Sequence, residues 1–166
     1  MREITFRKVG EGTGNKLDID RFDKIYKHIV VWDENDLEIV GSYRLGVGSE
    51  LIKEFGINGF YTSTLFNYSD EFISTYLNNS LELGRSFIQK KYWKTNALHY
   101  LWQGIGAFLY KHPEIKYMFG GVSISKNYNQ TASELIVYYF SKWYGNSNKS
   151  VIPNKEFIIS EKITQI

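Results

Sequence analysis

The alternation of apolar and polar residues predicts two strands early in the chain. Residues 25–32 and 37–46 are both rich in the β-branched and aromatic side chains that favour extended structure. The residues between them, Asp33-Glu34-Asn35-Asp36, are typical of a turn. We therefore expect a hairpin over residues 25–46, followed by a further short extended segment at 59–66.

Apolar residues spaced three or four positions apart predict two helices in the middle of the chain. A short helix over about 70–78 is expected to begin at Ser69, whose hydroxyl suits the capping position. A longer helix begins at Thr95 or Asn96 and ends before Pro113. Its expected apolar stripe consists of Leu98, Leu101, Trp102, Ile105, Phe108 and Leu109.

A third helix is expected in the last part of the sequence. It begins at Asn127 or Asn129, and Thr131 and Glu134 have the spacing of a capping box. Its apolar residues again share one side, and this side is expected to be buried. They are Ala132, Leu135, Ile136, Tyr139, Phe140 and Trp143.

The remaining extended segments complete the expected fold. Strands are predicted at about 81–89, at 117–124 and at 156–160. The strand–helix–strand unit from 81 to 124 should have parallel strands and a right-handed crossover. Together with the hairpin, this order predicts a single α/β (α+β) domain over residues 1–166, with a mixed sheet and helices on both faces.

The segment Leu81–Ile88 combines an apolar strand pattern with two charged residues. Glu82 and Arg85 stand close together in it, and ionised side chains are rarely buried unless they are paired or used in chemistry. On a regular strand they would point to opposite faces unless a bulge intervenes, and Gly84 is the easiest place for one. A charged, kinked strand inside a sheet indicates a functional site.

Composition narrows the chemistry. Of the 166 residues 43% are hydrophobic and 17% aromatic, as expected of a folded domain. The absence of cysteine excludes disulfides, thiolate nucleophiles and sulfur-ligated zinc. His28, His99 and His112 have no metal-ligand spacing, so no metal site is predicted. No apolar run approaches the roughly 20 residues of a membrane span, and the chain does not open on a signal peptide, so a cytoplasmic location is expected.

Charge is distributed unevenly, although the net charge is only +2. Between residues 83 and 133 the only acidic residue is Glu114. The basic residues of this window are Arg85, Lys90, Lys91, Lys94, Lys111, Lys116 and Lys126. The window favours an anionic partner, whether a phosphate, an acidic protein or a lipid surface. No nucleic-acid partner is expected, because no binding motif accompanies these lysines. Lysines that only keep the surface solvated are the plain alternative.

The order of the elements and four short segments resemble the GNAT superfamily of acyl-coenzyme A N-acyltransferases. The segments are the Asp-rich Asp18–Asp23, Ile39–Leu45 with Val-Gly-x-x-Arg-Leu, Leu81–Ile88 with Glu-Leu-x-Arg, and Tyr117–Ile124. Together they are similar to the branch of bacterial ornithine and amino-acid N-acyltransferases of lipid synthesis, often labelled hemolysins. The first three also resemble acyl-homoserine-lactone synthases, a sister group.

The resemblance implies transfer of an acyl group from a thioester to an amine. The charged cluster of the lactone synthases would be formed here by Asp20, Asp23, Arg44, Glu82 and Arg85. Glu82 is the candidate general base, acting directly or through one water, with a structural ion pair to Arg85 or Arg44 as its alternative. Arg85 would orient Glu82 or one of the nearby aspartates. Arg44 would either belong to the cluster or clamp the carboxylate of an amino-acid acceptor, which Asp20 and Asp23 would also help to bind.

Other residues are assigned to the acyl donor. Backbone N–H groups freed by the bulge around Ser86, Phe87 and Ile88 would polarise the thioester carbonyl. By resemblance, Tyr138 would protonate the departing thiolate. A long acyl chain would need an apolar lining, for which the candidates are Phe55, Phe60, Phe66, Phe72 and Trp102, although an ordinary core position is the simpler explanation for any one of them.

The segment after the bulged strand departs from the superfamily pattern. Residues 89–97 lack the glycines that usually hold the pyrophosphate of coenzyme A. Lys90, Lys91 and Lys94 instead suit the docking of an acidic acyl carrier protein. The expected co-substrate is thus an acyl thioester of carrier protein or coenzyme A, without a tightly bound cofactor. Contact with the inner membrane surface is a further option.

The beginning of the chain also departs from that pattern. Arg2–Arg7 resembles the end of the superfamily's first helix, and the strand that should precede this helix is missing. We therefore expect a piece of a longer protein or a start placed too late.

Three functions remain open from the sequence. The first is N-acylation of a small amine such as ornithine or glycine with a 3-hydroxy fatty acyl group, for aminolipid synthesis. The second is a signal synthase that acylates and lactonises S-adenosylmethionine. Against it, the residues before Asp18 show little of the arginine and aromatic that cover the nucleoside in that group. The third is a non-catalytic module that binds carrier protein or lipid.

Overall fold

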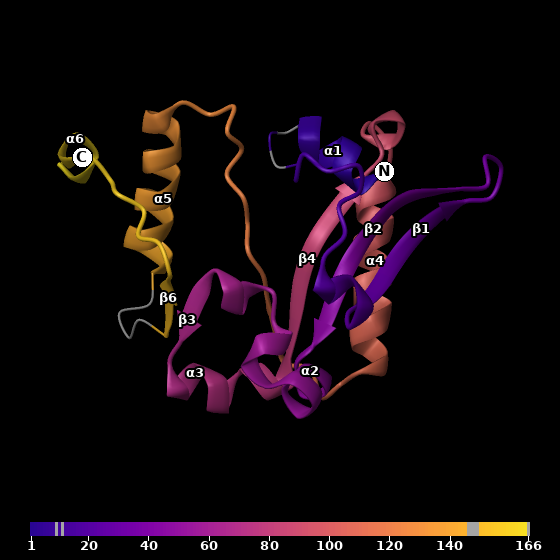
Figure 1. Cartoon of the computed structure of the whole chain (residues 1–166), viewed down its shortest axis with the longest axis horizontal. Helices are drawn as coiled ribbons and strands as arrows, with labels where there is room; N and C mark the ends of the chain where they lie inside the picture. Colours follow the sequence, from indigo (N-terminus) through magenta and orange to yellow (C-terminus); the bar gives the residue numbers. More distant parts are fainter. Residues whose placement is uncertain (9, 11, 146–149, 166) are drawn as a thin grey trace.

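The computed structural model describes residues 1–8, 10, 12–145 and 150–165. Within them, a central sheet has the strand order β1-β2-β4-β5 (Figure 1). Its strands are β1 (Lys27–Asp33), β2 (Glu38–Val47), β4 (Ser80–Ile88) and β5 (Tyr117–Phe119). The pairs β1–β2 and β2–β4 are antiparallel, and β4–β5 is parallel. The hairpin and the mixed sheet expected from the sequence are confirmed.

Helices cover both faces of this sheet, as predicted. Helix α4 (Ala97–Lys111) lies on one face, where the buried Ile105 packs against Leu45, Val47 and Leu81. Helices α1 (Arg2–Lys8) and α2 (Gly48–Phe55) lie on the other face. A second buried cluster forms there from Phe22, Tyr26, Leu51, Phe60 and Leu77. The stripe predicted for α4 is only partly buried, because Leu98 and Trp102 are about half exposed.

Strand β4 carries the predicted bulge. Arg44 of β2 lies opposite Gly84, whereas Ser42 lies opposite Phe87, so β4 contains one extra residue between these pairs. Arg85, and not Gly84, takes the left-handed conformation, with a φ of 48°. The bulge turns Arg85 toward the face that Glu82 occupies.

Strand β5 leaves β4 after a short parallel ladder. Ser80, Leu81 and Glu82 pair with Tyr117, Met118 and Phe119, and the extension predicted to Ile124 is wrong. The strands part at Gly120, where a Cβ atom would lie 2.2 Å from the carbonyl oxygen of Leu83. Only glycine fits so close to a neighbouring backbone.

A cavity of about 280 Å³ lies beyond the point where the strands part. We call it the slot. Its walls are Leu83, Gly84, Arg85 and Ser86 of β4, the segment 121–123, and the side chains of Phe6, Tyr43 and Tyr61.

Short turns connect the elements around the sheet. They are the 3₁₀ turns η1 (Arg21–Lys24), η2 (Gly56–Gly59), η3 (Thr62–Thr64), η4 (Leu77–Asn79) and η5 (Lys90–Tyr92). The segment 59–66 is therefore mostly turn and not the extended piece predicted from the sequence. Helix α3 (Asp70–Thr75) begins where predicted, because the Ser69 hydroxyl accepts a hydrogen bond from the backbone N–H of Phe72 at 3.1 Å.

The last part of the chain stands beside the sheet and does not extend it (Figure 1). It contains helix α5 (Gln130–Tyr144), strand β6 (Val151–Pro153) and helix α6 (Glu161–Thr164). Strand β6 pairs with β3 (Phe66–Tyr68) in a separate two-stranded sheet, and the strand predicted at 156–160 is absent from the described chain. Of the two predicted caps for α5, Asn129 is the one used; its side chain accepts from the N–H of Ala132 at 2.8 Å.

Two expectations about α5 are wrong. The helical spacing predicts that Tyr139, Phe140 and Trp143 belong to a buried stripe, but they are 50%, 57% and 66% exposed. Helical spacing identifies residues that share a side and does not identify what covers that side. The capping box is also wrong, because the buried carboxylate of Glu134 accepts hydrogen bonds from Gln130 and from the backbone N–H of Ser160, just before α6.

Candidate active site

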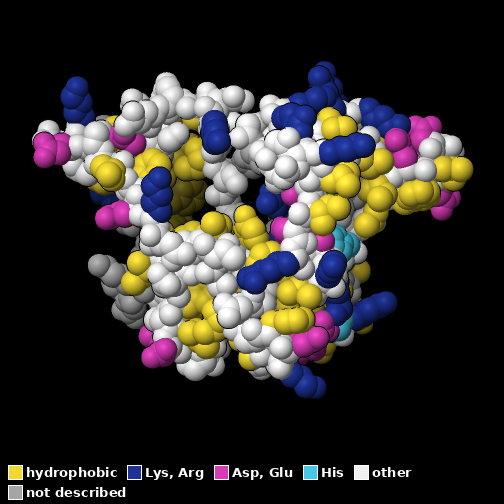
Figure 2. Space-filling model, viewed as in Figure 1, with side chains coloured by type: hydrophobic (Ala, Val, Ile, Leu, Met, Phe, Trp, Pro, Cys, Tyr) yellow, Lys and Arg dark blue, Asp and Glu magenta, His cyan; other side chains and the backbone are white. Residues whose placement is uncertain are grey.

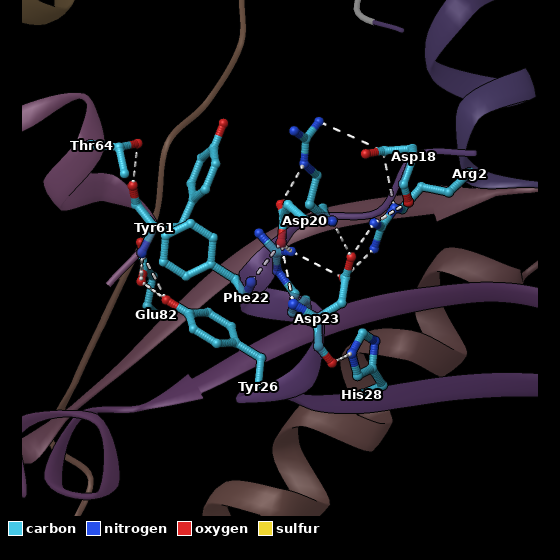
Figure 3. A network of polar contacts seen from close by, with 12 residues as sticks. Arg2, Asp18, Asp20, Phe22, Asp23, Tyr26, His28, Tyr61, Thr64 and Glu82 are labelled. Atoms are coloured by element: carbon cyan, nitrogen blue, oxygen red, sulfur yellow. Dashed lines mark hydrogen bonds and ion pairs between the residues drawn. The ribbon is translucent and has the colours of Figure 1, made fainter. Parts of the chain in front are cut away.

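Six charged side chains meet on the face of the sheet that carries α1, and we call them the aspartate–arginine cluster (Figure 3). They are Arg2, Asp18, Asp20, Asp23, Arg44 and Arg85. Turn η1 positions two of the carboxylates. The Asp20 carboxylate accepts from the N–H groups of Phe22 and Asp23, while the Asp23 carboxylate accepts from the N–H of Asp20 at 2.9 Å.

Arg44 is the buried centre of the cluster, with a side chain only 1% exposed. Its Nη1 donates to Asp20 at 2.7 Å and to Asp23 at 3.1 Å. Its guanidinium carbon lies 5.1–5.7 Å from the ring centroids of Phe22, Tyr26 and Tyr61. Nε and Nη2 have no hydrogen-bond partner among the described residues, so the rings and carboxylates stabilise this charge. Direct clamping of an acceptor by Arg44 would require the cluster to open.

Arg2 joins the cluster from α1, and the sequence analysis did not assign it a role. Its Nη1 and Nη2 donate to the two carboxylate oxygens of Asp23, at 2.7 Å and 2.6 Å. Its Nε donates to Asp18 at 3.0 Å. Burial alone would raise the pKa of the Asp23 carboxyl. The hydrogen bonds and charge of Arg2, with help from Arg44, outweigh burial and hold this pKa below its ordinary value.

Arg85 connects the cluster to the slot. It lies 3.7 Å from Asp18 and 3.9 Å from Asp20, and its side chain is 21% exposed where it lines the slot. The rings of Phe6 and Tyr61 each lie 5.5 Å from its guanidinium carbon. Arg2 and Phe6, which both precede Asp18, thus bring an arginine and an aromatic ring to the site, although the sequence before Asp18 indicated little of either.

Glu82 lies apart from the aspartate–arginine cluster. The rings of Phe22, Tyr26 and Tyr61 separate them, and no ion pair of Glu82 with either Arg44 or Arg85 occurs in the described part of the chain (Figure 3). The residue is 1% exposed, and its carboxylate accepts hydrogen bonds from the N–H of Tyr61 at 3.0 Å and the hydroxyl of Tyr26. The ion pair considered for Glu82 is thus wrong.

Thr62 links Glu82 to the surroundings of the slot. Its N–H and hydroxyl donate to the Glu82 carboxylate at 2.7 Å and 2.6 Å. Its methyl group lies beside Gly121, which lines the slot. Burial, and then the charge of Glu82, raise the pKa of the Tyr26 hydroxyl, so this donor stays protonated. The role of Glu82 as a base remains a prediction, and Thr62 stands between it and the slot.

The residues assigned to the acyl donor are only partly brought together. Ser86 is exposed and lines the slot, whereas Phe87 and Ile88 are paired with β2. Lys91 is engaged at the tip of the hairpin, where it pairs with Asp36 and Glu38. Lys90 and Lys94 are exposed.

Tyr138 lies away from the slot. It is on α5, which Figure 1 shows separated from β4, and its hydroxyl accepts a hydrogen bond from Lys142 at 3.1 Å. Of the aromatic residues considered for an acyl tunnel, Phe72 lines a cavity. This apolar cavity of about 450 Å³ lies along β5, and Tyr76, Tyr117, Met118 and Phe119 also contribute to its wall.

Glu3 connects helix α1, which supplies Arg2 and Phe6, to the loop that contains Thr13 and Gly14. The Glu3 carboxylate is buried and accepts from the hydroxyl and N–H of Thr13 at 2.7 Å and 2.9 Å, from the N–H of Gly14 and from Arg7. These hydrogen bonds, chiefly that of the Thr13 hydroxyl, lower the pKa of Glu3 from 4.5 to about 2.

We expect the stabilisation from Glu3 to disappear in acid. The folded-state pKa is depressed, so the contribution is complete above pH 4.5 and is lost as the pH falls to about 2. In urea denaturation, the stability difference between the wild type and Glu3→Gln should be largest near neutral pH and shrink across this window. Glu54→Gln on the exposed side of α2 is the control. A difference that stays constant from pH 4.5 to pH 2 would contradict this account.

The described residues contain no helix long and apolar enough to cross a bilayer. Nor do they contain a group of three histidine or acidic side chains arranged to hold a metal ion.

Comparison with known proteins identifies the family. Residues 1–103 match the family model of the acetyltransferase (GNAT) domain. The chain is 37% identical to a glycine N(alpha)-acyltransferase of Phocaeicola vulgatus, over 93% of this chain and 51% of that protein. It is 36% identical to the protein of the same name from Bacteroides thetaiotaomicron, over 96% of this chain and 50% of that protein. An L-ornithine N(alpha)-acyltransferase of Brucella abortus is 34% identical, over 74% of this chain and 44% of that protein.

The chain thus spans about half the length of the first two relatives. No solved structure matches it. The region matched by the family model contains the hairpin, the bulged strand and all six residues of the aspartate–arginine cluster. The chain therefore belongs to the acetyltransferase (GNAT) domain family.

Proposed function

We propose that the protein transfers a fatty acyl group from a thioester to the amine of a small amino acid such as glycine or ornithine. The observation that carries this proposal is the slot, which opens where β5 leaves β4 beside the bulge. An extended thioester arm can lie along the unpaired edge of β4, because a strand edge offers backbone hydrogen bonds to an added chain. The names of the relatives support an amino acid as the acceptor.

The proposed reaction forms an amide bond and breaks the carbon–sulfur bond of the thioester. The amine nitrogen attacks the carbonyl carbon, the amine loses a proton, and the departing thiolate gains one. Glu82 is positioned to take the proton only through Thr62 or a water, because its own carboxylate is enclosed. Arg85 is the cluster residue that lines the slot, so we assign the acceptor carboxylate to Arg85 in preference to Arg44.

The donor and the product belong to the same proposal. The cavity along β5 is lined by Phe72, Tyr76, Tyr117 and Phe119 together with Met118 and Val151, and this apolar lining suits an acyl chain such as a 3-hydroxy fatty acyl group. The thioester is that of acyl carrier protein or coenzyme A, and the product would enter aminolipid synthesis.

One experiment tests the slot and the activity together. Purified protein is incubated with 3-hydroxypalmitoyl carrier protein or coenzyme A and with glycine, ornithine, lysine and serine, and products are identified by mass spectrometry. We expect an N-acyl amino acid. Ser123→Trp, which fills the slot, should lower kcat/KM for the donor about a hundredfold by misplacing it.

Asn127→Trp is the matched control, because Asn127 is exposed on the same segment and does not line the slot. It should leave kcat/KM unchanged. Absence of product with every acceptor would contradict the function and favour a non-catalytic module. Product formed equally well by Ser123→Trp would contradict the slot as the donor site.

A signal synthase is the second candidate, and a specific observation favours it. An arginine and an aromatic residue from before Asp18 reach the site, since Arg2 pairs with Asp23 of the cluster and the ring of Phe6 lies against Arg85. The same assay with S-adenosylmethionine distinguishes the two functions, since a synthase would release an N-acyl lactone and an amino-acid acyltransferase would not.

A further inference from the structure

A shallow groove of about 210 Å³ lies on the outer side of α1, between this helix and the segment that follows β4. Its first wall is formed by Met1, which precedes α1, and by one helical stripe of α1: Ile4, Thr5 and Lys8. The other wall is formed by Gln89, Lys90, Lys91 and Trp93. The slot lies on the other side of α1, where Phe6 contributes to its wall.

The groove exposes large apolar side chains. Ile4 is 62% exposed, Met1 51% and Trp93 49%. The indole N–H of Trp93 donates to the carbonyl of Ile88 at 2.8 Å, so the ring is held in place while part of its apolar surface faces solvent. An anchored tryptophan beside aliphatic residues is typical of surfaces that enter the headgroup region of a bilayer.

Lysines that lack acidic partners surround these apolar residues. Lys8, Lys90 and Lys94 are exposed, and none forms an ion pair with a described residue. Lys126 adds a further positive charge, because its side chain lies next to Gly10 just beyond the end of α1. Figure 2 shows lysine and arginine side chains gathered over this end of the molecule.

Three described acidic side chains near the groove already have partners. Glu3 is bound inside the fold of α1, and the hairpin acids Asp36 and Glu38 pair with Lys91. Among the described residues that line or adjoin the groove, the unpaired charges are therefore positive and lie beside apolar side chains.

We propose that this groove binds an anionic membrane surface. Stable attachment to a bilayer needs both an apolar insertion and basic residues, and the groove supplies both. An acidic carrier protein is a less suitable occupant of the groove. Its thioester arm would have to reach the slot, and α1 lies between the slot and the groove. The proposal rests on the proposed function in one respect. An N-acyl amino acid is an amphiphile, and a membrane next to the enzyme would take up this product.

Co-sedimentation with lipid vesicles tests the proposal. We expect the wild type to bind vesicles of phosphatidylglycerol and phosphatidylcholine, and to bind pure phosphatidylcholine much more weakly. Lys90→Glu/Lys94→Glu should lower the partition coefficient on the anionic vesicles at least about 25-fold, since each lysine near such a surface contributes about fivefold. Rising salt should weaken binding by the wild type.

Lys111→Glu/Lys116→Glu is the matched control, because both lysines are exposed in the same basic window but lie at the far end of α4. It should bind like the wild type. Trp93→Ser tests the apolar part and should lower the partition coefficient about tenfold with little dependence on salt. Circular dichroism of each variant confirms that it is folded.

Two results would overturn the proposal. One is wild-type binding that is equal on neutral and anionic vesicles or absent on both. The other is unchanged vesicle binding by Lys90→Glu/Lys94→Glu together with a raised KM for carrier-bound donor, which would make the groove a carrier-protein site. Vesicle binding can be measured without turnover. A protein that fails to bind vesicles can therefore be distinguished from one that lacks the proposed acyltransferase activity.

Discussion

Replacing Glu82 by leucine is expected to destabilise the protein by about 3–5 kcal/mol, because buried donors then lose a charged acceptor. The N–H of Thr62 and the hydroxyl of Tyr26 both donate to this carboxylate inside the protein. Leucine offers them no hydrogen bond and admits no water. Urea denaturation monitored by circular dichroism measures the loss.

Two further variants separate this effect from a general sensitivity to mutation. Glu82→Gln keeps one oxygen but places an amide N–H₂ among donors, so a smaller loss of about 1–3 kcal/mol is expected. Glu54→Leu on α2 replaces an exposed glutamate and should change stability by less than about 0.5 kcal/mol. If Glu82→Leu were as stable as the wild type, the buried network described for this carboxylate would be wrong.

Replacing Arg44 by leucine is expected to cost about 3 kcal/mol of stability and to reduce the proposed acyltransferase activity. Its removal leaves Asp20 and Asp23 with less positive charge in a largely buried position. Arg2 still pairs with Asp23, which limits the loss. Asp20→Asn should be less harmful in the Arg44→Leu background than in the wild type, since the unpaired charge is then absent.

Arg21→Leu provides a matched control for Arg44. Both arginines contact the ring of Phe22, at 4.7 Å for Arg21 and 5.7 Å for Arg44, but Arg21 is exposed. Its replacement should therefore cost less than about 1 kcal/mol. Additive effects of Arg44→Leu and Asp20→Asn, or equal losses for the two arginines, would show that Arg44 is not the centre of the cluster.

The bulged strand could be predicted from the sequence because its signals are local. An acid and a base within an apolar strand, next to a glycine, indicate a kink whatever the rest of the chain does. The residue that takes the left-handed conformation could not be predicted, since Arg85 has no intrinsic preference for it. Its contacts with Asp18 and Phe6 come from other parts of the chain and compensate for the strain.

The other features that the sequence did not predict depend on contacts between distant segments. The role of Arg2 depends on the docking of α1, and an arginine near the start of a sequence carries no signal of it. The hydrogen-bond partners of Glu82 include two backbone N–H groups of a distant turn, which composition does not reveal. The exposure of the apolar side of α5 likewise depends on what packs against it, and helical spacing cannot supply that information.

The network that joins Tyr26 to Glu82, residues 56 positions apart, has a consequence for how the chain folds. Helices α4 and α5 depend on neighbouring residues and can form early, whereas this bond requires the hairpin and β4 to have met. We therefore expect the network to form late, after the folding transition state. Disrupting it should then accelerate unfolding far more than it slows folding, so these buried bonds set the lifetime of the native protein.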